Sequence, residues 1–251
     1  MTIINNDTIR FSDIDSKDLD QALSAACHWL TDIAQVQEDS VPDDQNSRKL
    51  AHTHWRGAIR GDYRVWDRKW GFFCPIWHTG QAVKSLCLAW EALGDDSLLT
   101  AARLGAEFIG NNRVDDEDDE DFGLILAYED LPHATNTSAI LECCNGLLHL
   151  SRLTGDASYQ HWVLDALYWI ARKMYRRGEG LFRDWYDPFK KQVLQGGPES
   201  GYHKVHPGRP LLDDGLFLTG HHLSVEKDFK VIFYETAERL LEEEEPPGNW
   251  I

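Results

Sequence analysis

The chain has 251 residues, of which 42% are hydrophobic and 27% charged, a composition typical of a globular protein. Its net charge of −17 argues against nucleic acid or an anionic membrane as the main partner. Much of that charge lies in two acidic runs, 115–121 and 242–245, and such runs usually form solvated loops or tails.

The cysteines and the first residues of the chain indicate in which cellular compartment the protein is expected. The five cysteines are odd in number and include the neighbours Cys143 and Cys144, which is not the pattern of a disulfide framework. The first twenty residues lack the basic start and apolar centre of a signal peptide. No apolar run approaches the ~20 residues that span a bilayer. We therefore expect a reduced, cytoplasmic protein without a membrane partner.

Amphipathic helices dominate the chain from its first part onward. One is expected over roughly 16–37, and the next over 79–93, where apolar residues recur at i, i+3, i+4 and i+7. Gly94 ends that second helix, and Asp95 offers an N-cap for a third over 98–109. Residues 79–109 are thus predicted to form a helical hairpin.

The same hairpin recurs 61 residues later. Gly155-Asp156 repeats Gly94-Asp95, and helices over 135–153 and 157–170 match the first pair. A weaker third copy is expected at 211–219 and 229–240. The period exceeds the ~34–47 residues of common helical solenoids, which excludes those repeat families.

Connections within each hairpin are short, whereas those between hairpins are long, at about 38–78, 111–134 and 178–209. Since consecutive helices are antiparallel, all long connections should gather at one end, above the N-termini of the first helix of each hairpin. Long ordered loops in a compact domain are usually functional. The third also predicts a β-hairpin near 181–194, because turn residues at 187–188 separate two strand-like runs.

The long loops carry residues suited to a sugar. Indole faces stack on the C–H face of a sugar ring, while planar polar groups bind its hydroxyls. The alternative is that the tryptophans only hold irregular loops on the helices. The candidate substrate-binding residues are Trp55, Arg60, Trp70, Trp77, Trp185 and Arg209.

Four further residues are candidates for catalysis: Asp213, Asp214, Asp184 and His78. A loop carboxylate beside apolar residues can have its pKa raised enough to donate a proton, as glycosidic chemistry requires. His78, just before the predicted helix 79–93, could act as an acid or base. As an alternative, Asp213 or Asp214 could be a helix N-cap without a catalytic role.

Metal and cofactor motifs are weak. The histidines at 52–54, 203–206 and 221–222 lack a matched pair of ligand clusters, and the acidic run 115–121 lacks the glycine of an EF-hand loop. Neither a phosphate-binding glycine loop nor a Gly-x-Ser-x-Gly elbow occurs. We therefore expect no metal and no cofactor.

Three segments together resemble the six-hairpin (α/α)6-toroid glycosidase superfamily, which includes unsaturated glucuronyl hydrolases and the N-acylglucosamine and cellobiose 2-epimerases. They are WHTGQAVKSLCLAWEALGDDSLLTAARLGAEFI, TSAILECCNGLLHLSRLTGDASYQHWVLDALYWIA and GRPLLDDGLFL. The resemblance implies an all-α toroid of helical hairpins whose inner-helix N-terminal loops line a carbohydrate cleft. It also implies aspartates as catalytic groups in a hydrolase, or histidines in an epimerase.

A full toroid has twelve helices, whereas this sequence predicts about seven. We expect residues 1–251 to form a single, incomplete toroid domain, with 1–15 as an extension and 242–251 as an acidic tail or linker. A homodimer or a missing C-terminal segment would cover the open edge at 211–241.

The predicted function is hydrolysis of a glycosidic bond, in an oligosaccharide or a sugar containing uronic acid, by carboxylate acid/base catalysis. Two alternatives stay open. One is an epimerase-like enzyme that uses histidine, and the other is a non-catalytic module that binds a sugar or a protein.

Overall fold

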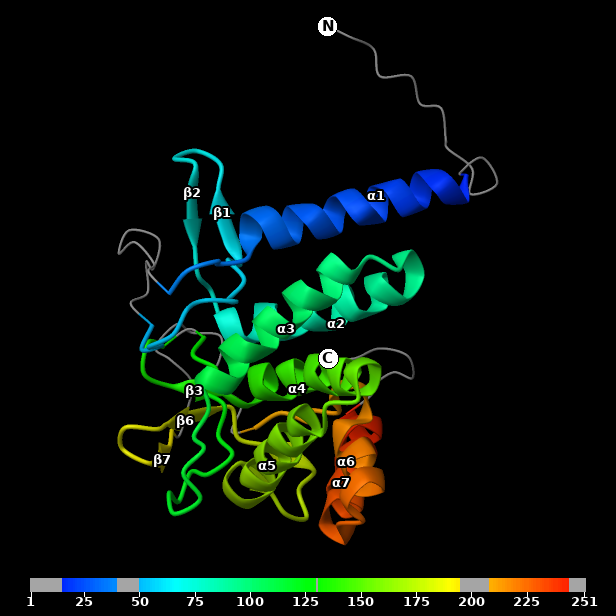
Figure 1. Cartoon of the computed structure of the whole chain (residues 1–251). Helices are drawn as coiled ribbons and strands as arrows, with labels where there is room; N and C mark the ends of the chain where they lie inside the picture. Colours follow the sequence, from blue (N-terminus) through cyan, green and yellow to red (C-terminus); the bar gives the residue numbers. More distant parts are fainter. Residues whose placement is uncertain (1–14, 40–49, 130, 195–207, 244–251) are drawn as a thin grey trace, which may run out of the picture.

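The computed structural model describes residues 15–39, 50–129, 131–194 and 208–243. Within these ranges, seven α-helices form one leading helix and three hairpins (Figure 1). The predicted N-terminal extension 1–15 and acidic tail 242–251 fall almost entirely outside the described residues. No described helix is long and apolar enough to cross a bilayer.

The leading helix α1 (Ser16–Trp29) continues into one π-helical turn, η2 (Leu30–Ala34), so the helical segment ends three residues earlier than predicted. The hairpins follow in chain order. Their helices are α2 (Pro75–Leu93) with α3 (Asp96–Asn111), α4 (Thr137–Thr154) with α5 (Ala157–Lys173), and α6 (Leu216–Ser224) with α7 (Lys227–Glu243). Helices α2, α4 and α6 pack side by side, while α3, α5 and α7 each pack on their own partner. These two layers are the inner and outer helices of a toroid.

Each hairpin turns within two residues, as the repeat predicts. Gly94 and Gly155 end α2 and α4 in the left-handed conformation, at φ 67° and 69°, where a glycine pays no steric cost. Asp95 then accepts a hydrogen bond from the backbone of the third helix, and Asp156 does the same for α5. The predicted Gly-Asp repeat is therefore confirmed as a repeated turn.

Short strands occupy the long connections. They form a hairpin of β1 (Asp62–Arg64) and β2 (Lys69–Gly71), a ribbon of β3 (Thr135–Asn136), β6 (Trp185–Asp187) and β7 (Gln192–Val193), and a pair of β4 (Tyr175–Arg176) and β5 (Leu181–Phe182). The hairpin predicted near 181–194 is confirmed as β6–β7. The β1–β2 hairpin was not predicted. Figure 1 places β1, β2, β3, β6 and β7 at one end of the bundle, opposite the turn between α2 and α3.

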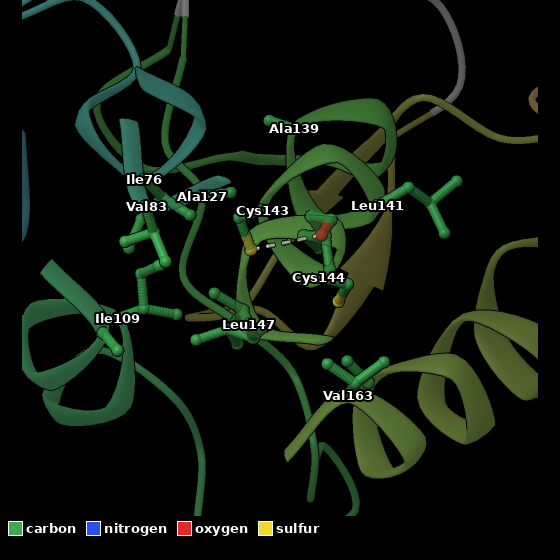
Figure 2. Close-up of a cluster of buried hydrophobic side chains, with 14 of the residues drawn as sticks. Ile76, Val83, Ile109, Ala127, Ala139, Leu141, Cys143, Cys144, Leu147 and Val163 are labelled. Atoms are coloured by element: carbon green, nitrogen blue, oxygen red, sulfur yellow. Dashed lines mark hydrogen bonds between the residues drawn. The ribbon is translucent and has the colours of Figure 1, made fainter. Parts of the chain in front are cut away.

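The inner helices α2 and α4 approach closely because glycines line their contact. A Cβ at Gly146 would lie 2.2 Å from the carbonyl oxygen of Gly80. Beside this contact, Cys143 and Cys144 are buried among side chains from α2, α3 and α5, as Figure 2 shows. Burial raises the pKa of the Cys143 thiol well above its usual range. All five cysteines are buried and none is in a disulfide, so they pack as small side chains of the core.

The acidic run 115–121 is not solvated throughout, which corrects the expectation of a wholly exposed loop. Its last residue, Asp121, is buried beside the C-terminal end of α5. Its Oδ1 accepts hydrogen bonds from the Trp169 indole at 3.1 Å and from the Tyr186 hydroxyl at 2.7 Å. Lys173 lies 3.5 Å from the same oxygen. Asp121 therefore ties the second long connection to α5 and β6.

Candidate active site

Two consecutive aspartates precede the inner helix of the third hairpin in an uncommon backbone conformation. Asp213, Asp214 and Gly215 all have positive φ, at 40°, 54° and 73°. The turn η3 (Asp213–Gly215) and α6 have Leu212 and Gly215 as N-caps, and neither makes a side-chain cap hydrogen bond. The two aspartates therefore do not cap a helix. Strained backbone of this kind persists where the surroundings hold it, and it concentrates at functional sites.

Asp214 is the exposed member of the pair and is held as an anion. Lys84 of α2 donates to its Oδ2 at 2.5 Å, and the amide of Asn145 on α4 donates to the same oxygen at 2.5 Å. The hydrogen bond from Lys84 is the main reason that the pKa of Asp214 is lowered. Two inner helices thus hold this carboxylate in place.

Asp213 is in the opposite environment. Its pKa is raised to about 7, mainly by burial and also by the neighbouring charges of Glu142 and Asp214, while Arg209 opposes the rise. Its Oδ2 is buried and has no hydrogen-bond partner within the described part of the chain. Near neutral pH, Asp213 can therefore hold a proton that it is able to donate.

The pair lines an open pocket of about 380 Å³ between α2, α4 and η3. Its lining is polar throughout, and consists of Gln81, Lys84, Ser85, Glu142, Asn145, Asp213 and Asp214. A second hollow of about 670 Å³ shares Asn145 and Asp214 and follows the groove between α4 and α6. It is also lined by His149, whose pKa is lowered mainly by burial.

Glu142 connects the pocket to the predicted residues of the first long loop. The indole Nε1 of Trp77 donates to its Oε2, and Gln81 donates to the same oxygen at 2.6 Å. His78 stacks on Trp77, with ring centroids 5.0 Å apart. The Nδ1 of His78 lies 2.6 Å from the carbonyl oxygen of Phe73 and so carries a proton, and burial lowers the pKa of this imidazole. His78 is thus neutral at pH 7, with Nε2 as its free acceptor.

Asp184 and Arg209 form a second pair beside Asp213. Arg209 donates through Nε to Asp184 Oδ1 at 2.6 Å and through Nη2 to the hydroxyl of Ser138 at 3.3 Å. Asp184 is 8% exposed, so its carboxylate is nearly enclosed. In this arrangement Asp184 orients Arg209, and the guanidinium opposes the rise in the pKa of Asp213.

The other predicted residues lie elsewhere. Trp55 and Trp185 are 7% and 2% exposed and pack in the core, so neither indole offers a free face to a sugar. Arg60 donates to the carbonyl oxygens that end η2, at 3.3–3.4 Å. Trp70 lies on β2 against Trp29 and Tyr63. None of these four is among the residues that line the Asp213 pocket.

Of the predicted residues, Asp213 and Asp214 line the pocket, and Asp214 lies midway along α2 and α4, against Lys84 and Asn145. Trp77 and His78 adjoin it through Glu142, and Asp184 adjoins it through Arg209. Sequence reasoning missed the helix-borne residues of the site: Gln81, Lys84, Glu142, Asn145 and His149. A signal was available, because the last three recur at i, i+3 and i+7 and form a polar stripe in the segment 139–150, whose other residues are apolar or glycine.

No group of three or more His, Cys, Asp or Glu side chains suited to a metal ion occurs in ranges 15–39, 50–129, 131–194 and 208–243. Of the three histidine groups considered as metal motifs, 203–206 lies outside these ranges.

Comparison with known proteins gives different results for the sequence and for the structure. Neither a protein-family model nor a curated protein matches the sequence. Solved structures do match. A sugar epimerase from a ruminal bacterium is 15% identical over 88% of this chain and 55% of its own, with a TM-score of 0.56. A D-mannose isomerase is 10% identical over 90% and 51%, with a TM-score of 0.54.

A third match is an inactive variant of the α-1,6-mannanase GH76A of Salegentibacter sp. HEL1_6, in complex with α-1,6-mannotriose. It is 14% identical over 69% of this chain and 48% of its own, with a TM-score of 0.51. The fold is the six-hairpin (α/α)6 toroid. The predicted fold class is therefore confirmed, and the chain spans about half the length of these solved structures.

Proposed function

We propose that this toroid chain is a carbohydrate-active enzyme that hydrolyses a glycosidic bond at the Asp213–Asp214 pocket. The observation that carries the proposal is the opposite ionisation of these two carboxylates on one open pocket, since the pKa of one is raised and that of the other is lowered. When the surroundings of two titratable groups push their pKa values apart, the group with the raised pKa is the acid and the other is the anion or base.

In this mechanism Asp213 donates its proton to the glycosidic oxygen as the bond to the anomeric carbon breaks. The anion of Asp214 stabilises the positive charge that develops on the sugar ring, or attacks the anomeric carbon to form a covalent glycosyl intermediate. A water molecule then attacks the anomeric carbon, which frees Asp214 where it had bonded, and the proton of this water passes to the carboxylate of Asp213 and restores the acid. Lys84 and Asn145 keep Asp214 in place throughout. Trp77 and His78 supply a stacking wall at one side of the pocket, and Arg209 binds a hydroxyl or carboxylate of the substrate at the other.

The comparisons support the same class of reaction. The inactive mannanase variant carries replacements at two adjacent aspartates, and this chain has an adjacent pair in its pocket. A sugar with α-1,6-linked mannose is therefore the first substrate to test, followed by an oligosaccharide that contains uronic acid.

The test is turnover of α-1,6-linked manno-oligosaccharides, followed by chromatography of the products. Hydrolysis should be lost in Asp213→Asn and in Asp214→Asn, while substrate affinity persists in both. Asp118→Asn, in the exposed part of the acidic run, is the matched control and should keep full activity. If both pocket variants hydrolyse the substrate as the native chain does, the proposal is wrong. Binding without any turnover in the native chain would identify a sugar-binding module instead.

A second candidate function is sugar epimerisation or isomerisation. It is favoured by His149, which lines the hollow next to Asp214, and by the epimerase and isomerase structures that match 88% and 90% of the chain. An enzyme of this kind would interconvert mannose and glucose or fructose, a reaction that NMR follows directly. His149→Gln would then abolish turnover, whereas Asp213→Asn would be the decisive variant for hydrolysis.

Self-association and a cytoplasmic location belong to the same proposal. The α6–α7 edge exposes Val225, Val231, Tyr234 and Leu241, and exposed apolar groups of this size favour an interface. Five free cysteines fit a reducing compartment. Light scattering at micromolar concentration should give the mass of a dimer if this edge closes on a second copy, and the mass of one chain if it does not.

A further inference from the structure

The β1–β2 hairpin carries an aromatic surface at the end of the bundle that holds the long connections (Figure 1). Tyr63 and Trp70 lie opposite each other across the strands, with ring centroids 5.0 Å apart, and Trp29 of α1 lies 5.6 Å from Trp70. Trp66, in the turn of the hairpin, is 83% exposed, more than any other tryptophan of the described residues. A group of neighbouring apolar side chains left in water, unlike a single one, often marks a binding surface.

This surface encloses a hollow of about 310 Å³ whose lining combines rings and charged groups. The lining residues are Asp62, Tyr63, Arg64, Trp66, Trp70 and Gly71. The guanidinium of Arg64 is fixed by Asp67, at 3.1 Å. A pyranose ring needs both kinds of group, because its C–H face stacks on an aromatic ring while its hydroxyls require planar, charged hydrogen-bond partners. The mixed lining favours a sugar over a purely apolar partner.

Contacts of the intervening residues join this hollow to the Asp213 pocket. Gly61, directly before β1, packs so closely on His78 that a Cβ there would lie 2.2 Å from Nδ1. His78 stacks on Trp77, and Trp77 donates to Glu142 in the wall of the pocket. Successive contacts therefore lead from the hairpin, through the His78–Trp77 stack, to the wall of the pocket.

We propose that the β1–β2 hollow is a distal sugar subsite of the same cleft. The substrate is then an oligosaccharide that extends from the Asp213–Asp214 pocket, across Trp77 and His78, to a sugar ring stacked on Trp66. A single monosaccharide would leave this subsite empty. The inference rests on the proposed function, because that function places the reacting bond at the aspartate pair.

The test compares sugars of increasing length on the full chain carrying Asp213→Asn, so that nothing is consumed. The probes are mannose and α-1,6-linked mannobiose, mannotriose and mannotetraose, titrated by calorimetry. Affinity should rise along this series. Adding Trp66→Ala should weaken the longest probe by about 10-fold, equivalent to one stacking contact, and leave mannose unchanged. Trp66→Phe should restore most of the loss.

Phe189→Ala is the matched control, because Phe189 is 67% exposed and lies in the turn of the other hairpin, β6–β7. It should leave every affinity unchanged. Equal affinity of mannotetraose for the chains with and without Trp66 would overturn the subsite, as would affinity that does not rise with length. In either case hydrolysis by the native chain would leave the proposed function intact. Conversely, loss of binding in Trp66→Ala without any turnover by the native chain would support the subsite and refute the catalytic assignment.

Discussion

Asp213 and Asp214 are neighbours in the chain, yet the fold buries the carboxylate of the first and pairs that of the second with a lysine. Burial raises the pKa of Asp213 to about 7, while the hydrogen bond from Lys84 lowers the pKa of Asp214. The left-handed backbone at both residues turns their side chains into these different surroundings. Backbone strain, burial and one ion pair thus give two identical side chains different ionisation states: Asp213 is an acid that holds its proton, and Asp214 is an anion.

The raised pKa of Asp213 predicts a cost in stability. Between its ordinary value of 3.8 and about 7, the native chain holds a proton that the unfolded chain has lost, so stability falls as pH rises through this window. Asp213→Asn removes this penalty and should raise the free energy of unfolding at pH 8, by at most about 4 kcal/mol. Urea unfolding of both chains at pH 8 and at pH 3.5 measures this gain in the free energy of unfolding. Equal gains at both pH values would contradict a titration of Asp213.

Removing the charge of Glu142 should shift the catalytic pH profile. Because this charge raises the pKa of Asp213, Glu142→Gln should lower that pKa. The alkaline limb of hydrolysis would then move to lower pH, since Asp213 would lose its proton sooner. A profile of kcat/KM against pH between 4 and 9 gives the answer. An unmoved alkaline limb would show that another group is the acid.

Lys84 should determine where the rate of hydrolysis falls on the acidic side of the pH profile, because Asp214 becomes protonated there. Without its ammonium group, the pKa of Asp214 returns toward the ordinary value, so Lys84→Met should move the acid limb to higher pH. The same rate profile measures it. Arg177→Met removes another exposed cation from an ion pair, with Asp228, and serves as the control that should leave both limbs in place. The assignment fails if the two variants behave alike.

The sequence predicts the hairpins well because they depend on local signals. The Gly94-Asp95 and Gly155-Asp156 turns specify both the end of one helix and the start of the next, and the apolar period specifies the buried face. The alternation of short and long connections then predicts which end of the bundle carries the strands of the long connections. The β1–β2 hairpin was missed, because its three-residue strands are held by tertiary contacts of Trp70 with Trp29.

The individual roles of the site residues depend on three-dimensional burial, which no local pattern reveals. Trp55 and Trp77 are alike in the sequence, since each adjoins a histidine in the first predicted long connection, but the first is packed in the core and the second reaches Glu142. Lys84 and Asn145 read as ordinary helix residues until α2 and α4 bring them to one carboxylate. Asp121 shows the same limit, because its burial cannot be distinguished within a run of seven acidic residues.

The close approach of α2 and α4 predicts a strong effect of one methyl group. Gly146→Ala gains helix propensity, about 1 kcal/mol, but places a Cβ against the carbonyl of Gly80 and forces the inner helices apart. We expect a net loss of about 1–3 kcal/mol in the free energy of unfolding, measured by urea titration. Gln21→Ala, at an exposed position of α1, should change it by less than about 0.5 kcal/mol. A Gly146→Ala chain as stable as the native one would mean that the helices can separate without cost.

Asp121 should matter far more than its neighbours in the acidic run. Asp121→Ala leaves the Trp169 indole and the Tyr186 hydroxyl buried without their acceptor, and it also removes the anion beside Lys173. Since each unpaired buried donor costs about 1–3 kcal/mol, the free energy of unfolding should fall by about 2–5 kcal/mol. Asp118→Ala, at an exposed position three residues earlier, should have almost no effect. Equal stability of the two variants would show that the whole run is solvated, as its composition alone predicts, and that the second long connection is not fixed to α5.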